Sequence, residues 1–137
     1  GAAYAWGINF DGQLGDGTTT TRHVPVAVVG GHTFSAIGPG WYHTVALTPT
    51  GHAYAWGQNQ YGQLGDGTTT NRHEPVPVAG EQTFSAISRS GQHSLALTES
   101  GAAYAWGWNL DGQLGDGTTT HRYEPVPVSG GLTFQQP

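Results

Sequence analysis

The sequence has no cysteine, no lysine and no methionine, and only 9% of its residues are charged, against about 25% in an average globular domain. Without cysteine, the chain can form neither a disulfide framework nor a thiolate metal site. Its four cations are the arginines at positions 22, 72, 89 and 122, and nine acidic residues give a net charge of −5. Binding of nucleic acid needs a basic patch or stripe, so we expect no nucleic-acid partner.

Long apolar segments are also missing. No run approaches the roughly 18 residues that span a membrane. The sequence shows no signal or transit peptide and no basic cluster of the juxtamembrane kind, so we expect no membrane partner. The chain starts without methionine, in the middle of a repeated pattern, and we therefore expect it to be excised from a longer protein.

Glycine and a long internal repeat dominate what is present. The 23 glycines and 8 prolines indicate many turns, while 11% aromatic residues argue against disorder. The segment GQLGDGTTT stands at 12–20, 62–70 and 112–120, and AYAWG stands at 3–7, 53–57 and 103–107. The period is 50 residues, so the 137 residues hold about 2.7 copies, namely 1–50, 51–100 and a truncated 101–137. Periods of this length are typical of solenoids and propellers.

Each repeat predicts four short strands bounded by turn residues. One such set of four, which runs across the boundary between the second and third copies, is TFSAI at 83–87, SLALT at 94–98, AYAWG at 103–107 and EPVPV at 124–128. The last strand contains Pro125 and Pro127, which have no N–H to donate, so it belongs at a sheet edge. Helical periodicity is absent. The pattern predicts an all-β chain, with a β-propeller of four-stranded antiparallel blades.

The array predicted in this way is incomplete. The third and fourth strands of one blade come first, two whole blades follow, and a lone first strand lies at Thr133–Phe134, which makes about 11 strands by this reading. Closed propellers have about four to eight blades, so apolar blade faces stay exposed in one chain. If the end of one copy were joined directly to the start of the next, the blade at the junction would still lack its second strand. We therefore expect a single propeller segment, part of a longer chain or of a larger assembly.

These residues carry a family resemblance that covers essentially the whole chain. The segment WGQNQYGQLGDGTTT, the strand EPVPV and the segment GQHSLALTESGAAYAWG resemble the repeat of the regulator of chromosome condensation family. The resemblance implies a propeller, usually with seven blades, in which the repeat boundaries and the blade boundaries are offset. Family members include nucleotide exchange factors, but many are protein-binding modules, so the fold does not settle the function.

The long glycine-rich loop has the composition of a calcium loop, with Asn9, Asp11 and Asp16 as possible ligands. The EF-hand pattern fails because its Glu is missing, and Tyr61 replaces Asp11 in the next repeat. A structural loop fits better, with Leu14 as its apolar anchor and Asp16 bonded to the turn. We expect Arg22 to pair with Asp16, likewise in the other repeats, and we expect no metal and no cofactor.

Catalytic patterns are weak as well. His43 and His93 share one repeat position, and their recurrence favours a structural hydrogen bond to a neighbouring loop over a catalytic base. A catalytic site needs one asymmetric constellation of residues, and a near-perfect repeat provides each candidate about three times. We therefore predict no catalytic residues and a chain that is not an enzyme.

The copies differ mainly in the loops between the first and second and between the third and fourth strands. In a meander these loops leave the same face, and bulky aromatic residues occur there, of the type enriched at binding hot spots. Neutral drift of exposed loops is the competing interpretation. The predicted partner-binding residues are Phe10, Asp11, Trp41, Tyr42, Gln58, Tyr61, Trp108 and Leu110.

These patterns predict a non-enzymatic propeller module that binds a protein or another macromolecule through this face. Two alternatives stay open. A nucleotide exchange factor for a small GTPase is implied by the resemblance alone, and a carbohydrate-active enzyme could use the aromatic residues and carboxylates. A lysine-free, cysteine-free sequence rich in threonine and glycine favours an exported bacterial protein, outside the cell or on its surface.

Overall fold

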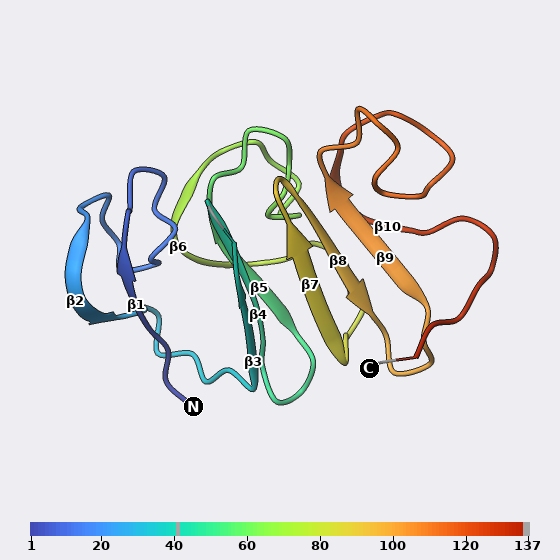
Figure 1. The fold of residues 1–137 in the computed structure, drawn as a ribbon. Helices are drawn as coiled ribbons and strands as arrows, with labels where there is room; N and C mark the ends of the chain where they lie inside the picture. Colours follow the sequence, from blue (N-terminus) through green and yellow to red (C-terminus); the bar gives the residue numbers. More distant parts are fainter. Residues whose placement is uncertain (41, 136–137) are drawn as a thin grey trace.

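The computed structural model describes residues 1–40 and 42–135 and is built from antiparallel strands (Figure 1). A two-stranded sheet comes first, made of β1 (Tyr4–Gly7) and β2 (Arg22–Ala27). The next sheet holds β3 (Ala36–Pro39), β4 (His43–Leu47), β5 (Ala53–Gly57) and β6 (Arg72–Pro77). The third holds β7 (Ala86–Ser90), β8 (His93–Leu97), β9 (Ala103–Gly107) and β10 (Arg122–Pro127).

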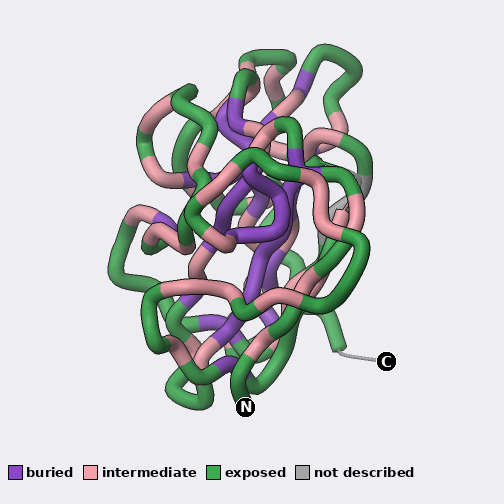
Figure 2. Tube along the Cα trace, turned by 90° about the vertical axis from the view of Figure 1, so that its left-hand side faces the viewer, coloured by how far each residue is buried: buried purple, intermediate pink, exposed green. Residues whose placement is uncertain are grey.

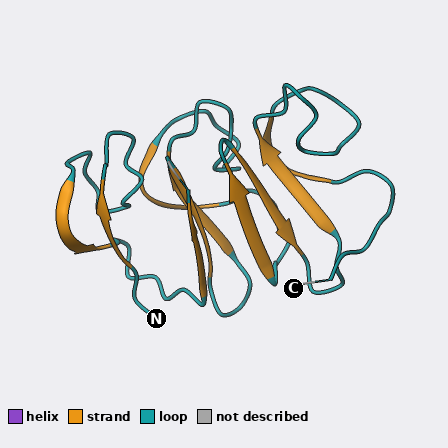
Figure 3. Cartoon of the chain, viewed as in Figure 1, coloured by secondary structure: helices purple, strands orange, loops and turns teal. Residues whose placement is uncertain are grey.

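The two four-stranded sheets are the predicted blades. Their strands lie in the chain order β3-β4-β5-β6 and β7-β8-β9-β10, and the sheet of β1 and β2 matches the outer half of such a blade. Figure 3 shows strands and loops only, and no helix of the described part is long and apolar enough to cross a membrane. Because one blade runs from Ala36 to Pro77, each blade combines residues of two successive repeats.

Alternation along the strands explains their two faces. In β5, Tyr54 and Trp56 alternate with Ala53 and Ala55, and successive side chains of a strand point to opposite faces. The neighbouring strand β4 runs antiparallel to β5.

The proline-bearing strands β6 and β10 lie outermost in their sheets, as predicted, because proline removes a ladder hydrogen bond.

The first strand of each blade starts later than predicted. The expected segment 83–87 contains Phe84, yet β7 begins at Ala86. The N–H of Phe84 donates to the carbonyl of Gly51 at 2.8 Å, and the Phe84 ring centroid lies 6.1 Å from that of Trp106. Phe84 is thus held between blades and cannot take part in the ladder.

The other strand bounds differ less. The strand predicted at 94–98 is β8, one residue earlier, and the strand predicted at 124–128 is β10, which begins at Arg122 and ends at Pro127. The predicted lone strand at Thr133–Phe134 is wrong, because Thr133 makes only an isolated bridge to Ala102. The described residues therefore contain ten strands.

The core lies between blades, and each interface centres on one tryptophan. Trp56 is 1% exposed and Trp106 is 0% exposed. Trp56 lies against Gly15 of the preceding long loop, where a Cβ atom would stand 2.7 Å from Trp56 Nε1. The φ of Gly15 is +70°, so close approach and backbone both require glycine. The Trp56 indole N–H donates to the carbonyl of Gln13 at 3.0 Å. Figure 2 shows the buried segments gathered in the middle of the molecule.

Polar groups also connect neighbouring blades. His43 Nε2 lies 3.0 Å from Ser94 Oγ, and the Ser94 hydroxyl donates to the carbonyl of Gln63 at 2.9 Å. All three residues are 0% exposed. The structural role predicted for His43 is confirmed, but its partner is in strand β8 of the next blade instead of a loop.

The long loop after β1 is closed by a buried amide and a carboxylate. Asn9 is 0% exposed, and its Nδ2 donates to Asp16 Oδ1 at 3.1 Å and to the carbonyl of Thr18 at 3.0 Å. Its Oδ1 accepts from the N–H of Leu14 at 3.0 Å. Arg22 Nε donates to Asp16 Oδ2 at 2.9 Å. The predicted ion pair and apolar anchor are confirmed, and the same bonds recur in both later repeats.

These bonds set the acidity of the loop carboxylates. Burial alone would raise the pKa of Asp16, but the hydrogen bonds from the threonine, arginine and asparagine side chains outweigh it and lower the pKa from 3.8 to about 2. The same balance lowers the pKa of Asp66 and lowers that of Asp116 to about 2. The charged form of each carboxylate therefore stabilises the folded loop.

Replacing Trp56 by alanine should lower the free energy of unfolding by about 3–5 kcal/mol, as for other buried large aromatic side chains. Trp6 has the same repeat position but is 62% exposed. It serves as the matched control, and Trp6→Ala should change stability by less than about 0.5 kcal/mol. Urea unfolding at low protein concentration measures both. Equal losses in the two variants would contradict the interblade role of Trp56.

Stability should fall as the pH drops from about 4 towards 2. A carboxylate whose pKa is lowered on folding contributes stability above its unfolded pKa of about 3.9, and that contribution is lost as the pH falls through the folded value. Asp116→Asn should reduce this loss. Asp111→Asn, in an exposed part of the same loop, should leave it unchanged. Denaturant unfolding at several pH values gives the slope of the unfolding free energy against pH. If this slope is the same in Asp116→Asn as in the unaltered chain, the Asp116 carboxylate does not cause the loss.

Candidate functional site

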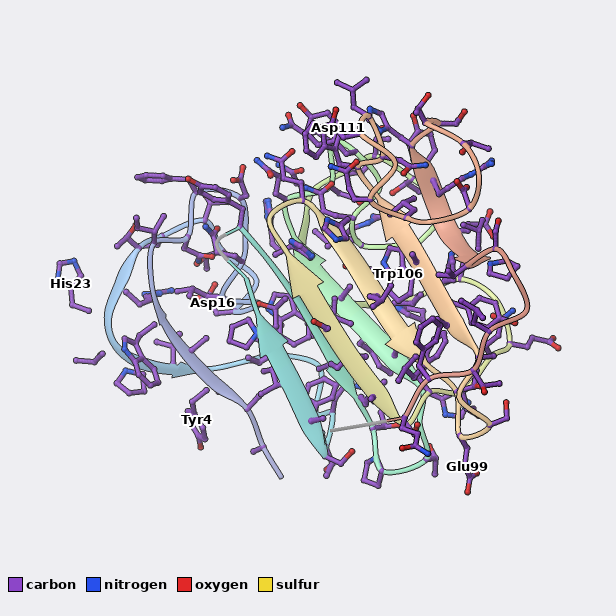
Figure 4. All side chains as sticks on the ribbon, turned by 45° about the vertical axis from the view of Figure 1, so that its right-hand side comes forward. Tyr4, Asp16, His23, Glu99, Trp106 and Asp111 are labelled. Carbon is purple, nitrogen blue, oxygen red and sulfur yellow. The ribbon has the colours of Figure 1, made fainter. Side chains whose placement is uncertain are left out.

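Short turns and long loops meet at one end of the blades, which we call the loop face. Figure 4 shows Asp111, in the long loop after β9, at the end opposite Glu99 in the β8–β9 hairpin. The N–H of Gln58 donates to the carbonyl of Tyr42 at 2.7 Å, and the N–H of Trp108 donates to that of Gln92 at 3.0 Å. Backbone bonds thus fix each long loop beside the short turn of its own blade, as the meander predicted.

A hollow of about 440 Å³ opens on the loop face, and we call it the aromatic pocket. Its lining residues are Tyr42, Tyr61, Gly91, Gln92 and Trp108. The ring centroids of Tyr61 and Trp108 lie 6.3 Å apart at an interplanar angle of 47°. Tyr42 is 41% exposed. The pocket lies where two blades meet, since Tyr42 and Tyr61 belong to one blade and Trp108 to the next.

Three of the predicted site residues come together in this pocket, namely Tyr42, Tyr61 and Trp108. Gln58 lies next to it, and its Oε1 accepts from Gln63 Nε2 at 3.2 Å. Gln58 therefore supports the loop and does not line the pocket.

The other predicted residues lie elsewhere. Phe10 is 75% exposed and Leu110 is 61% exposed, and neither lines the aromatic pocket. The carboxylate of Asp11 accepts from Asn71 Nδ2 at 3.3 Å, which joins two neighbouring long loops. Trp41 lies outside the described residues.

The prediction missed three residues that shape the pocket. Gly91 and Gln92 line it from the β7–β8 turn, and the His121 ring centroid lies 5.3 Å from that of Tyr61. All three stand at positions where the repeats differ. The predicted set, which includes Gln58 and Leu110, left all three out.

The lining of the aromatic pocket is mostly aromatic. It offers aromatic faces and one amide side chain, and none of its lining residues carries a carboxylate. Within 1–40 and 42–135, no three His, Asp or Glu side chains form a group that could hold a metal ion. Burial lowers the pKa of His93, next to the turn, and so favours its neutral ring. Aromatic faces bury flat or apolar groups of a ligand, and tyrosine adds a hydroxyl.

Comparisons with known proteins agree with this architecture. The sequence profile of the regulator of chromosome condensation (RCC1) repeat matches residues 50–97 and 100–136, and a second profile of the same repeat matches 27–63 and 84–113. Among curated proteins no relative matches.

Solved propellers resemble the fold at low sequence identity. Prp20p from Saccharomyces cerevisiae is 21% identical with a TM-score of 0.80, over 95% of this chain and 34% of Prp20p. Human WBSCR16 is 23% identical with a TM-score of 0.83, over 94% of this chain and 33% of WBSCR16. The chain thus spans about a third of each of these proteins. With both profile matches and the blade topology in agreement, the chain belongs to the RCC1 repeat family of β-propellers.

Proposed function

We propose that the chain is a non-enzymatic binding module whose loop face holds an extended segment of a partner protein, with one side chain anchored in the aromatic pocket. The observation that carries this proposal is the convergence of Tyr42, Tyr61 and Trp108 from three separate connections into one hollow. Tyrosine and tryptophan are enriched among the residues that dominate binding energy at interfaces.

The hollow suits a single anchoring side chain. Its volume is about 440 Å³, near the lower end of the roughly 300–1,000 Å³ of ligand pockets. The backbone bonds that tie Gln58 to Tyr42 and Trp108 to Gln92 hold its walls in place before the partner arrives. A site formed in advance loses less conformational freedom on binding.

Similar propellers support a protein partner. The structure of Prp20p was described together with its binding to Gsp1p and histones, and another structure shows yeast Prp20 with Kap60 bound. These partners belong to Prp20, and they support a protein as the partner of this chain.

The pocket lining favours binding over glycoside hydrolysis. Glycosidases use two carboxyl groups on either side of the scissile bond. The aromatic pocket has no carboxylate among its lining residues. Asp11, the acid predicted nearby, is engaged by Asn71 of the neighbouring loop.

Replacing Trp108 by alanine should weaken partner binding by about 2 kcal/mol or more, the size expected of a hot spot. The probe is a set of peptides selected on the folded chain from a displayed random library. Ile8→Ala is the matched control, because Ile8 has the same repeat position but lies outside the aromatic pocket. Affinities come from titration calorimetry or fluorescence.

Two outcomes would count against the proposal. Selected peptides whose affinity is unchanged in both Trp108→Ala and Tyr61→Ala would place the site elsewhere on the module. Failure to select any peptide, with binding only to sugars in a parallel glycan screen, would replace the protein partner by a carbohydrate.

A further inference from the structure

The first sheet carries interface residues that the rest of the described chain leaves exposed. Trp6 is 62% exposed, whereas Trp56 and Trp106 at the same repeat position are 1% and 0% exposed. Tyr4 is 60% exposed, and Figure 4 shows it projecting away from the rest of the molecule. This face is the one that, in the other two blades, points towards the preceding repeat.

The last blade carries the matching hollow at the opposite end. At Gly15 and Gly65 an added Cβ would stand 2.7 Å from a tryptophan Nε1, whereas at Gly115 its nearest contact would be Val128 Cγ1 at 3.2 Å. Gly115 has nearly the same φ, +67°, as Gly15 and Gly65. It lines a hollow of about 500 Å³. The backbone of Gly115 therefore has the conformation that accommodates a tryptophan at Gly15 and Gly65.

The walls of this hollow repeat the walls that surround Trp106. The residues Leu95, Leu97, Ala103, Leu114, Val128 and Phe134 line it. Fifty residues earlier, the same positions are Val45, Leu47, Ala53, Leu64, Val78 and Phe84, which form one core cluster with Trp106. We call the hollow with Gly115 the socket.

We propose that the two ends bind each other in separate copies of the chain, with Trp6 and Tyr4 of one copy seated in the socket of a second copy. The occupant is specified by the chain itself, because both internal interfaces already join these residue types at a spacing of one repeat. The Phe84 ring lies 5.9 Å from Tyr104 and 6.1 Å from Trp106 between centroids. Phe134, which is 41% exposed, would meet Tyr4 and Trp6 of the second copy in the same manner.

Backbone groups extend the match. Inside the chain, the N–H of Gly17 donates to the carbonyl of His73 at 2.9 Å, and the N–H of Gly67 donates to that of Tyr123 at 2.8 Å. Across the copies, the equivalent bond joins the N–H of Gly117 to the carbonyl of His23. The contact therefore adds a directional hydrogen bond to the apolar surface.

The contact uses blade faces, so it needs no strand beside the open edge of β1. Each copy contributes a different end, which makes the interface heterologous. Such interfaces continue from copy to copy into a ring or an open chain and do not stop at a symmetric dimer. The expected solution behaviour is therefore reversible association that extends beyond two copies.

Sedimentation velocity from low to high micromolar concentration tests the proposal. The unaltered chain should associate, and Trp6→Ala should weaken association about tenfold or more, as for a central aromatic anchor. Phe134→Arg should do the same by placing a charge in the socket. Both residues are exposed in the single chain, so circular dichroism and melting temperature should stay unchanged.

Mixing the two variants gives the sharpest result. Trp6→Ala keeps an intact socket and Phe134→Arg keeps an intact tryptophan, so the mixture should form a one-to-one dimer that grows no further. Tyr42→Ala, which alters the aromatic pocket alone, should associate normally. The association test is therefore independent of the proposed function. A chain that stays monomeric, association that Trp6→Ala leaves unchanged, or a mixture that forms no dimer would each overturn the proposal.

Discussion

The rest of the structure depends on the direct packing of the Trp56 indole against Gly15. Trp56 occupies space that any Cβ at Gly15 would fill, so the loop that carries Gly15 must be held within tenths of an ångström. Asn9 and Asp16 provide that rigidity from inside the loop. A loop with few apolar residues thereby becomes a packing surface, and a chain with a low content of charged residues gains a core that is distributed between blades and not within one of them.

Much of the fold could be predicted because the strands follow simple alternation. The strand at 103–107 has the predicted bounds, since Tyr and Trp alternate with Ala and the two ends are marked by Gly. The first strand of each blade begins later than predicted. Thr and Phe have high β-propensity, but the Thr-Phe pair before this strand does not join the ladder. Phe84 fills the space between two blades, and propensity does not distinguish an aromatic residue in a ladder from one that packs across sheets.

The site was predictable only in part. Differences between copies pointed to Tyr42, Tyr61 and Trp108, which line the aromatic pocket, but such differences do not show which side chains converge. Convergence depends on how one blade is turned relative to the next, and this places Tyr61 beside Trp108 while Phe10 is left exposed. Gly91 and Gln92 line the pocket with a turn and an amide, and neither was among the predicted residues. The Asn9 side chain was weighed only as a metal ligand, although its buried amide is the centre of the loop.

Every blade and every interface mixes residues from two successive repeats, and this offset has a consequence for how such genes can change length. Because the spacing is 50 residues without insertion or deletion, duplicating or deleting any 150 consecutive base pairs, wherever the break falls, regenerates a complete loop, a complete tryptophan seat and a complete strand order. The reading frame is kept and no new contact has to arise. Recombination between repeats therefore adds or removes blades in whole units, and the residues that differ at the loop face are carried along unchanged.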